Sequence, residues 1–241
     1  MTKILIAALT ALSGIVFWSL ASRATVSSFG LIPFWALADL IIFLALLGIS
    51  FLFATPWQAM VLVLLSASPI VYLLDNKFLA VIIIGALALS AAYPATSIRK
   101  QVAFQLTFSV WDILHKGLPT FLTFLALSLA AFFYPQLGTI TFQDIIPEPL
   151  FEKVAALLPF EVPSDALYRT SIDLLQERFR SYERYLPAVF ALGVFAAFRT
   201  VFIAVGWASI AFAWLIIKML LYAKVVAILA RQVSQEYIEF K

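Results

Sequence analysis

Charged side chains are nearly absent from the first 98 residues of the chain. Only five occur there: Lys3, Arg23, Asp39, Asp75 and Lys77. The full chain of 241 residues has 16 Lys and Arg and 13 Asp and Glu, so most charges come later. A run of about 20 apolar residues crosses the hydrocarbon core of a bilayer as a helix. The sequence therefore predicts a four-span membrane region over residues 1–96, with spans at 4–20, 31–54, 57–74 and 78–93.

The remaining composition extends this prediction to the whole chain. Hydrophobic residues make up 64% and charged residues 12%, whereas soluble domains are about half apolar and about a quarter charged. Residues 118–135 form a fifth apolar run, and residues 187–230 form a much longer one. That last run is either a pair of spans folded back near Gly206 or one long helix, and no hairpin residue favours the pair. We predict an all-α polytopic transmembrane bundle of about six spans, whose final unit at 187–241 is a long helix with a cytoplasmic extension.

Residues 97–117 lie between the fourth and fifth predicted spans and alternate between apolar and polar faces at helical spacing. A lone strand there would leave its edges unpaired in the membrane, so a helix is favoured. We predict one amphipathic helix at the membrane interface. Its aromatic anchors would be Phe104, Phe108 and Trp111.

Residues 136–186 are the only long polar stretch, and four prolines interrupt them. Ser164 is a good helix N-cap, and an apolar stripe with steps of three and four residues follows it. We predict a small extramembrane helical cap whose stripe docks on the membrane surface, on the spans or on a partner. The stripe consists of Tyr168, Ile172, Leu175, Phe179 and Tyr182.

The charged residues inside apolar runs are the best candidates for a functional site. A charge within a span costs a few kcal/mol and therefore needs a partner or a role. Asp39 lies in the second span, and Arg199 lies in the final run. One hypothesis is an intramembrane ion pair or solute site between these spans. The alternative places Asp39 near the head groups and has Arg199 reach outward to the surface.

A second candidate is the sequence Ser66-Ala67-Ser68-Pro69 in the third span. Proline frees a backbone carbonyl, and some transporters use such a helix break to coordinate ions. Ser66, Ser68 and Pro69 therefore form a candidate break site. The alternative is a kinked helix packed on its neighbours, which is more common.

Cofactor and metal chemistry have little support in the sequence. The chain has no cysteine and one histidine, which excludes thiolate and multi-histidine metal sites. It contains neither HExxH nor a phosphate-binding P-loop motif. We therefore expect no metal, no cofactor and no enzymatic activity. Nucleic acid is not an expected partner because the basic residues are dispersed, although the net charge is +3.

Three functional classes remain, in order of preference. The first is a non-enzymatic membrane subunit or scaffold that docks to partner proteins or to copies of itself in the lipid bilayer. The second is a small-solute or ion transporter or channel that uses Asp39 and Arg199. The third is a membrane-embedded enzyme acting on lipid or peptide. Basic residues near the predicted span ends favour the cytoplasmic side of the membrane. We therefore predict a multi-pass protein of the cell (inner) membrane with both termini in the cytoplasm. The first span, with Ser19-Leu20-Ala21 at its end, also fits a cleavable signal.

Overall fold

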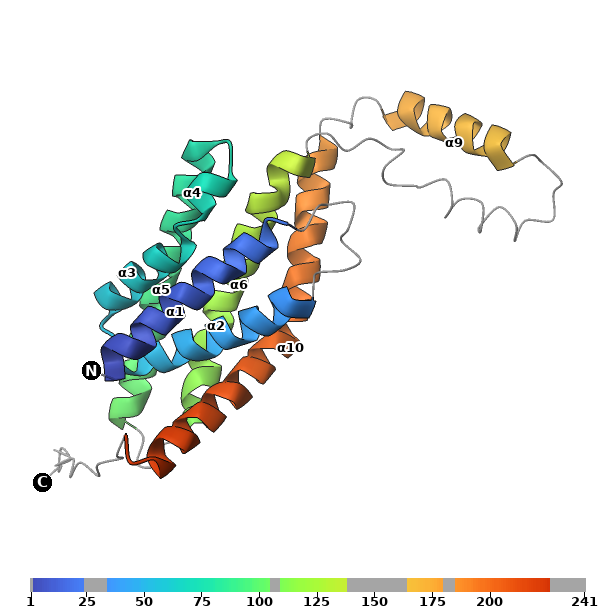
Figure 1. Cartoon of the computed structure of the whole chain (residues 1–241). Coiled ribbons are helices and arrows are strands. Elements are labelled where there is room, and N and C mark those ends of the chain that lie inside the picture. The colour runs from blue at the N-terminus through green and yellow to red at the C-terminus, as the bar shows by residue number, and fades with distance from the viewer. Residues whose placement is uncertain (1, 24–33, 105–108, 138–163, 180–184, 226–241) are drawn as a thin grey trace, which may run out of the picture.

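The computed structural model describes residues 2–23, 34–104, 109–137, 164–179 and 185–225. The regular secondary structure in these ranges is all helical (Figure 1). The helices are α1 (Thr2–Ala21), α2 (Phe34–Phe53), α3 (Pro56–Ala67), α4 (Ile70–Leu73), α5 (Lys77–Phe104), α6 (Val110–Leu137), α9 (Ser164–Phe179) and α10 (Leu186–Tyr222). Six segments are long and apolar enough to cross a membrane, with α3 and α4 together forming the third. The protein is thus a multi-pass α-helical membrane protein.

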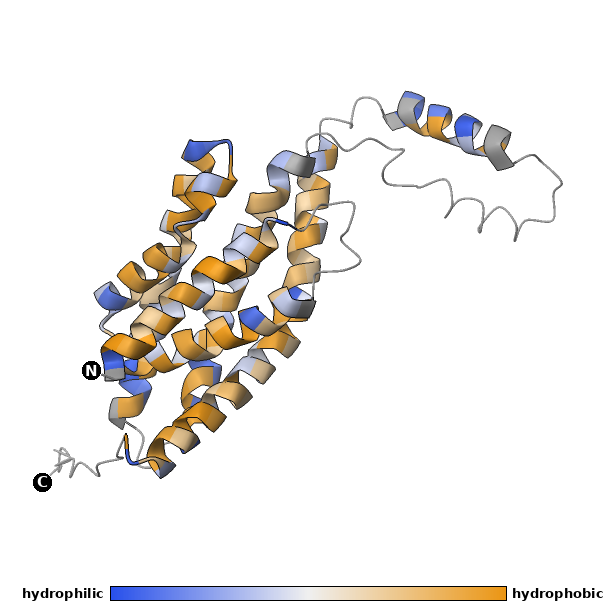
Figure 2. Ribbon diagram, viewed as in Figure 1, coloured by the Kyte–Doolittle hydropathy of each residue, from blue (hydrophilic) through white to orange (hydrophobic). Residues whose placement is uncertain are grey.

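The membrane helices form one bundle in which apolar residues dominate every helix (Figure 2). Helix α1 packs on α2 and α3, α5 packs on α3 and α6, and α10 packs on α6 and α2. In Figure 1, α1 starts at the same end of the bundle at which α10 finishes. We call this the N-terminal end, and the end at which α5 and α10 begin the opposite end.

Aromatic rings join helices across the core. Phe17 of α1 stacks on Phe43 of α2, with ring centroids 6.3 Å apart. Phe51 of α2 meets Phe121 of α6 edge-on at 6.1 Å. Phe121 and Phe51 are almost fully buried. Because lipid is as apolar as these side chains, their close packing contributes to helix association more than the hydrophobic effect does.

Glycine allows the closest approach between two of the spans. A Cβ atom built on Gly14 of α1 would lie 2.5 Å from the Cβ of Ser66 in α3 and 2.9 Å from the ring of Phe43. Carbon atoms in ordinary contact are about 3.5–4.0 Å apart. Only glycine therefore fits at this crossing of α1 and α3.

The prediction of one interfacial helix over residues 97–117 is wrong. Residues 97–104 continue α5, and residues 110–117 are the first turns of α6, which extends the fifth span beyond the predicted 118–135. Helix α6 begins after Ser109, which acts as its N-cap residue. The Ser109 hydroxyl accepts a hydrogen bond from the backbone N–H of Asp112. The apolar face that suggested one helix instead joins two: Gly117 of α6 lies against Ile98 of α5.

The fourth span does not end at residue 93, as the sequence predicted. Pro94 lies inside α5, which runs ten residues further to Phe104. The proline lacks an N–H and so removes one helical hydrogen bond. Packing against α6 compensates, since a Cβ atom on Gly117 would lie only 3.3 Å from Pro94. Neighbouring helices commonly allow proline within membrane spans.

The final run is one continuous helix, as predicted, and the rest of its predicted extension, residues 226–241, lies outside the described residues. Helix α10 ends at Tyr222. The N–H of Val225 donates to Leu220 O at 3.0 Å, and that of Lys224 donates to Leu221 O at 3.0 Å. Lys224 has a φ of 56°. These bonds and this left-handed residue form a Schellman motif, which turns the chain away from the helix axis.

Helix α9 confirms the predicted helix that starts at Ser164. It lies apart from the membrane helices beyond the opposite end of the bundle (Figure 1). Within the described residues it therefore does not pack on the spans. The other part of the predicted cap, residues 138–163, lies outside the described residues.

Candidate functional site

Asp39 is the most unusual polar group among the described membrane residues. Its Oδ1 accepts a hydrogen bond of 3.0 Å from the hydroxyl of Ser13, which α1 places opposite α2. Its Oδ2 is buried and has no hydrogen-bond partner in the part of the chain that the structure describes. A buried carboxylate oxygen without a donor is costly, so this group has unused capacity to accept a hydrogen bond or bind a cation.

The structure does not bring Asp39 and Arg199 together as an ion pair. Asp39 is bonded to Ser13, and within the described residues no contact shorter than 4.0 Å joins its carboxylate to a basic side chain. Arg199 is half-buried on α10. The helices do adjoin, since α10 packs on α2. The predicted neighbouring spans are therefore present, while the predicted direct pair is not.

The other buried hydroxyl groups are mostly satisfied within their own helices. Ser66 donates to Leu62 O at 2.8 Å, and Ser209 donates to Val205 O at 2.7 Å. Thr10 donates to Ile6 O at 2.7 Å. Because these hydrogen atoms are used locally, the hydroxyl groups add little polarity to the spaces between helices.

The candidate break at Ser68 and Pro69 interrupts the third span without unwinding it. Helix α3 ends at Ala67, and α4 begins at Ile70. Both intervening residues keep right-handed helical angles, with φ and ψ of −53° and −32° at Ser68 and of −60° and −25° at Pro69. The Ser68 hydroxyl donates to Leu65 O at 2.8 Å. The geometry is a tightened helical turn, and its hydroxyl group is already engaged.

The predicted docking stripe on α9 is partly covered. Ile172 is 2% exposed, and Tyr168 and Leu175 are half-buried, while the neighbouring Leu174 is 57% exposed. The side chain of Phe179 and the whole of Tyr182 lie outside the described residues.

Of the predicted interfacial anchors, only Trp111 can be placed. The side chains of Phe104 and Phe108 lie outside the described residues. The Trp111 ring contacts that of Trp207 on α10 at 5.2 Å, and the His115 ring contacts Trp207 at 5.3 Å. Trp111 therefore joins α6 to α10 near the N-terminal end of the bundle. His115 belongs to the same aromatic cluster.

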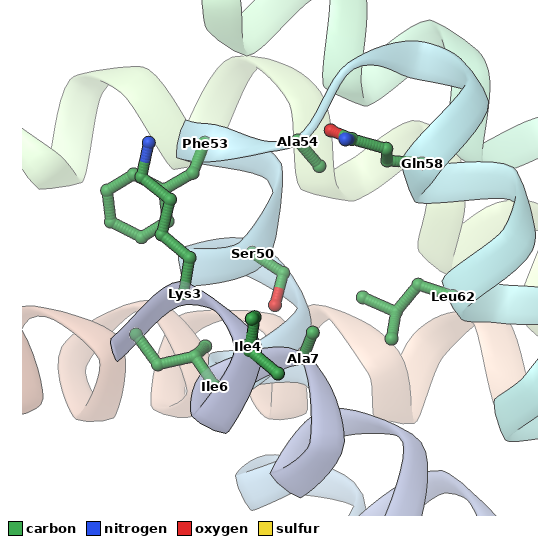
Figure 3. Close-up of a pocket in the computed structure, with 9 residues that line it drawn as sticks. All are labelled: Lys3, Ile4, Ile6, Ala7, Ser50, Phe53, Ala54, Gln58 and Leu62. Carbon is green, nitrogen blue, oxygen red and sulfur yellow. The ribbon is translucent and has the colours of Figure 1, made fainter. Parts of the chain in front are cut away.

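A cleft that the sequence did not predict lies at the N-terminal end of the bundle (Figure 3). Its volume is about 260 Å³, and the start of α1, the end of α2 and the start of α3 enclose it. Its lining residues are Lys3, Ile4, Ile6, Ala7, Ser50, Phe53, Ala54, Gln58 and Leu62. One cation and two polar side chains thus face a mainly apolar space.

A capping box shapes the wall of this cleft. The hydroxyl of Thr55 accepts from the N–H of Gln58 at 3.3 Å, and Gln58 Oε1 accepts from the N–H of Thr55 at 2.9 Å. The pattern Thr-x-x-Gln at 55–58 is visible in the sequence and could have indicated this arrangement. Lys3 carried no comparable signal, because its contact with Phe53 depends on how α1 and α2 pack.

No family model, no curated protein and no solved structure matches this chain significantly. Among the described residues, no group of three His, Cys, Asp or Glu side chains is placed to hold a metal ion. The fold and the side chains described above are therefore the basis for any functional proposal.

Proposed function

We propose that the protein is a non-enzymatic membrane subunit that packs against a transmembrane helix of a partner protein. The exposure of α10 supports this proposal. In its most apolar stretch only 17% of the residues are buried, compared with 56% for α2 and 61% for α6. Helices α6 and α2 pack on one side of α10. Among the described residues, no other helix packs extensively on its remaining surface.

The length of α10 argues that lipid alone does not cover it. Its 37 residues extend for about 55 Å at 1.5 Å per residue, whereas the hydrocarbon core is about 30 Å thick. Membrane helices tilt by up to about 40°, at which α10 would still span about 42 Å. Some apolar turns of α10 therefore leave the hydrocarbon. A large exposed apolar surface outside lipid is typical of a protein interface.

Small residues give α10 a face suited to another helix. Gly193 and Ala197 are exposed and lie four residues apart, hence on one side of the helix. A Cβ atom added at Gly193 would meet no atom within 4 Å. Leu192 is 67% exposed beside them. A small-x-x-x-small pattern lets two helices approach closely in a membrane, which favours a helical partner.

The charge distribution supports a cytoplasmic position for the N-terminal end of the bundle. Lys3 lies there at the start of α1, Arg99 and Lys100 near the end of α5, Lys116 near the start of α6, and Lys218 near the end of α10. Basic residues near span ends favour the cytoplasmic side. We therefore propose a cell membrane protein with both ends of the chain in the cytoplasm.

Site-specific photocrosslinking in the native host tests the proposed interface. A benzophenone amino acid would replace Leu192 on α10 or, as a matched control, Leu89 on α5, which is 66% exposed. We expect one discrete protein adduct from position 192 and none from position 89. Gly193→Ile should reduce that adduct at least tenfold. Gly85→Ile should not, although Gly85 also faces open space.

Equal labelling at positions 192 and 89, or an adduct that survives Gly193→Ile, would reject the interface. An adduct of twice the chain mass would identify the partner as a second copy. An adduct of another mass would identify a different subunit.

The unpartnered oxygen of Asp39 supports a second candidate function, the transport of protons or small cations. A carboxylate oxygen buried between α1 and α2 is a chemically suitable carrier site. Vesicles that contain the purified chain and a pH-sensitive dye would report proton flux after a potassium-driven potential is applied. Transport predicts flux that Asp39→Asn abolishes and that Asp75→Asn, at an exposed turn, leaves unchanged. Flux no greater than in protein-free vesicles would reject proton transport.

A further inference from the structure

The cleft at the N-terminal end combines the cationic side chain of Lys3 with apolar walls. We infer that it binds one anionic lipid from the surrounding bilayer, with the acidic head group at Lys3 and Gln58 and an acyl chain against the apolar wall. Figure 3 shows Lys3 and Gln58 on opposite sides of the cleft, with Leu62 and Ala7 among the residues below them.

The polar groups of the cleft offer donors for an acceptor ligand. Gln58 Oε1 is occupied by the N–H of Thr55, so the amide nitrogen is the part of Gln58 that remains to donate. The Thr10 hydroxyl gives its hydrogen to Ile6 O, so in its 3.1 Å contact with Ser50 the donor is Ser50. Ser50 thus has no hydrogen left for a ligand. The available donors are the amide of Gln58 and the ammonium of Lys3.

Lys3 has no acidic partner within the described part of the chain. Its ammonium group lies over the ring of Phe53, whose centroid is 5.9 Å from Nζ. None of the described residues that line the cleft is acidic. A lysine beside donors and without a carboxylate attracts an anion, and phosphate is an anion that lysine commonly binds.

The position of the cleft matches the level of lipid head groups. Lys3 is the first residue of the first span, Phe53 is the last of the second, and Pro56 is the first of the third. Trp57 lies at the same level and is 70% exposed, which is typical of residues at the membrane–water interface. A lipid beside this cleft thus has its phosphate near Lys3 and its chains beside the apolar walls.

The size of the cleft sets how much of the lipid it takes. Pockets for whole small molecules are about 300–1,000 Å³, so a cleft of about 260 Å³ holds a head-group phosphate and the upper part of one chain. The rest of the lipid stays in the bilayer. The other basic residues at this end, including Arg99 and Lys100, favour anionic over neutral lipids near the cleft.

Native mass spectrometry of the full chain in neutral detergent tests this inference. The probes are phosphatidylglycerol, phosphatidylcholine and inorganic phosphate, each added alone. We expect one tightly retained phosphatidylglycerol, and weaker retention of phosphatidylcholine. Lys3→Gln should weaken phosphatidylglycerol binding about fivefold, the effect typical of one lysine at an anionic membrane surface. Lys3→Arg should preserve it.

Two further variants separate the cleft from a general surface charge. Lys218→Gln is the matched control, since Lys218 also lies over an aromatic ring at this end, 4.6 Å from the centroid of Trp214, but does not line the cleft. It should change binding less than twofold. Ala54→Phe keeps the charge and fills the cleft, so it should weaken binding at least fivefold.

Several results would overturn the inference. Equal losses with Lys3→Gln and Lys218→Gln would indicate surface charge alone, as would full binding by Ala54→Phe. Binding of inorganic phosphate as tight as that of phosphatidylglycerol would show that the acyl chain contributes nothing. Circular dichroism of each variant, matched to the wild type, ensures that a loss reflects the cleft and not unfolding.

Discussion

Replacing Gly14 with alanine should weaken the contact between α1 and α3. The added Cβ atom would lie 2.5 Å from Ser66 Cβ, about 1 Å inside the ordinary contact distance. Ser66 Cβ is fixed to the backbone and cannot rotate away, so α1 must move. Overpacking of this kind costs about 1–3 kcal/mol. The better helix propensity of alanine returns about 0.8–1 kcal/mol. We expect a net loss of up to about 2 kcal/mol relative to the wild type.

The assay is equilibrium unfolding in mixed micelles with increasing sodium dodecyl sulfate, followed by circular dichroism. Gly85→Ala is the matched control, because a Cβ atom there meets nothing within 4 Å. That variant should be slightly more stable than the wild type. A movement of α1 also disturbs the neighbouring hydrogen bond from Ser13 to Asp39.

A second substitution at Ser66 identifies the atoms responsible. Ser66→Gly should restore at least half of the stability that Gly14→Ala loses, because it removes the opposing Cβ atom. Ser66→Ala should restore much less, because it keeps the Cβ atom at 2.5 Å and relieves only the milder contact of 3.0 Å with the Ser66 hydroxyl oxygen. A Gly14→Ala variant as stable as Gly85→Ala would refute this account of the crossing, as would equal rescue by both Ser66 variants.

Three further changes test local features in the same unfolding assay. Thr55→Ala removes the capping box of α3 and should cost about 1 kcal/mol, whereas Thr200→Ala, whose hydroxyl bonds within α10, should cost less than half of that. Lys224→Gly should stabilise the end of α10 by about 1 kcal/mol, because glycine adopts positive φ without strain; no gain would argue against the Schellman turn. Phe121→Ala should cost about 3–5 kcal/mol from the cavity beside Phe51. Leu89→Ala, at an exposed position, should have almost no effect.

The spans could be predicted from the sequence because their signal is local. Apolar run length and the scarcity of charge depend on neighbouring residues alone, and the six expected spans are present. The continuity of α10 followed in the same way from the absence of a hairpin residue near Gly206. Helix bounds beside prolines were predicted less well, because packing of α6 on α5 decides whether Pro94 ends a helix.

The side-chain contacts of the candidate site could not be predicted, because they depend on helix rotation. Asp39 was identified as exceptional from its place in an apolar run. Its partner is Ser13 rather than Arg199, and nothing in a single sequence says which face of α1 meets α2. The cleft at Lys3 has the same origin, since it exists only where three helix ends converge. Of the features that shape the cleft, the capping pattern at residues 55–58 is the one that the sequence alone indicates.

The packing of α10 on α2 also sets the order in which the bundle can be completed. These helices lie more than 130 residues apart in the chain, and α10 is the last of the described spans to leave the ribosome. Contacts between distant segments form late, because a long loop must close first. Until α10 arrives, the side of α2 that it covers remains open to lipid or to another helix. The contact between α2 and α10 is therefore among the last to form. A nascent chain stalled before α10 would expose this face of α2 to the proteins of membrane quality control.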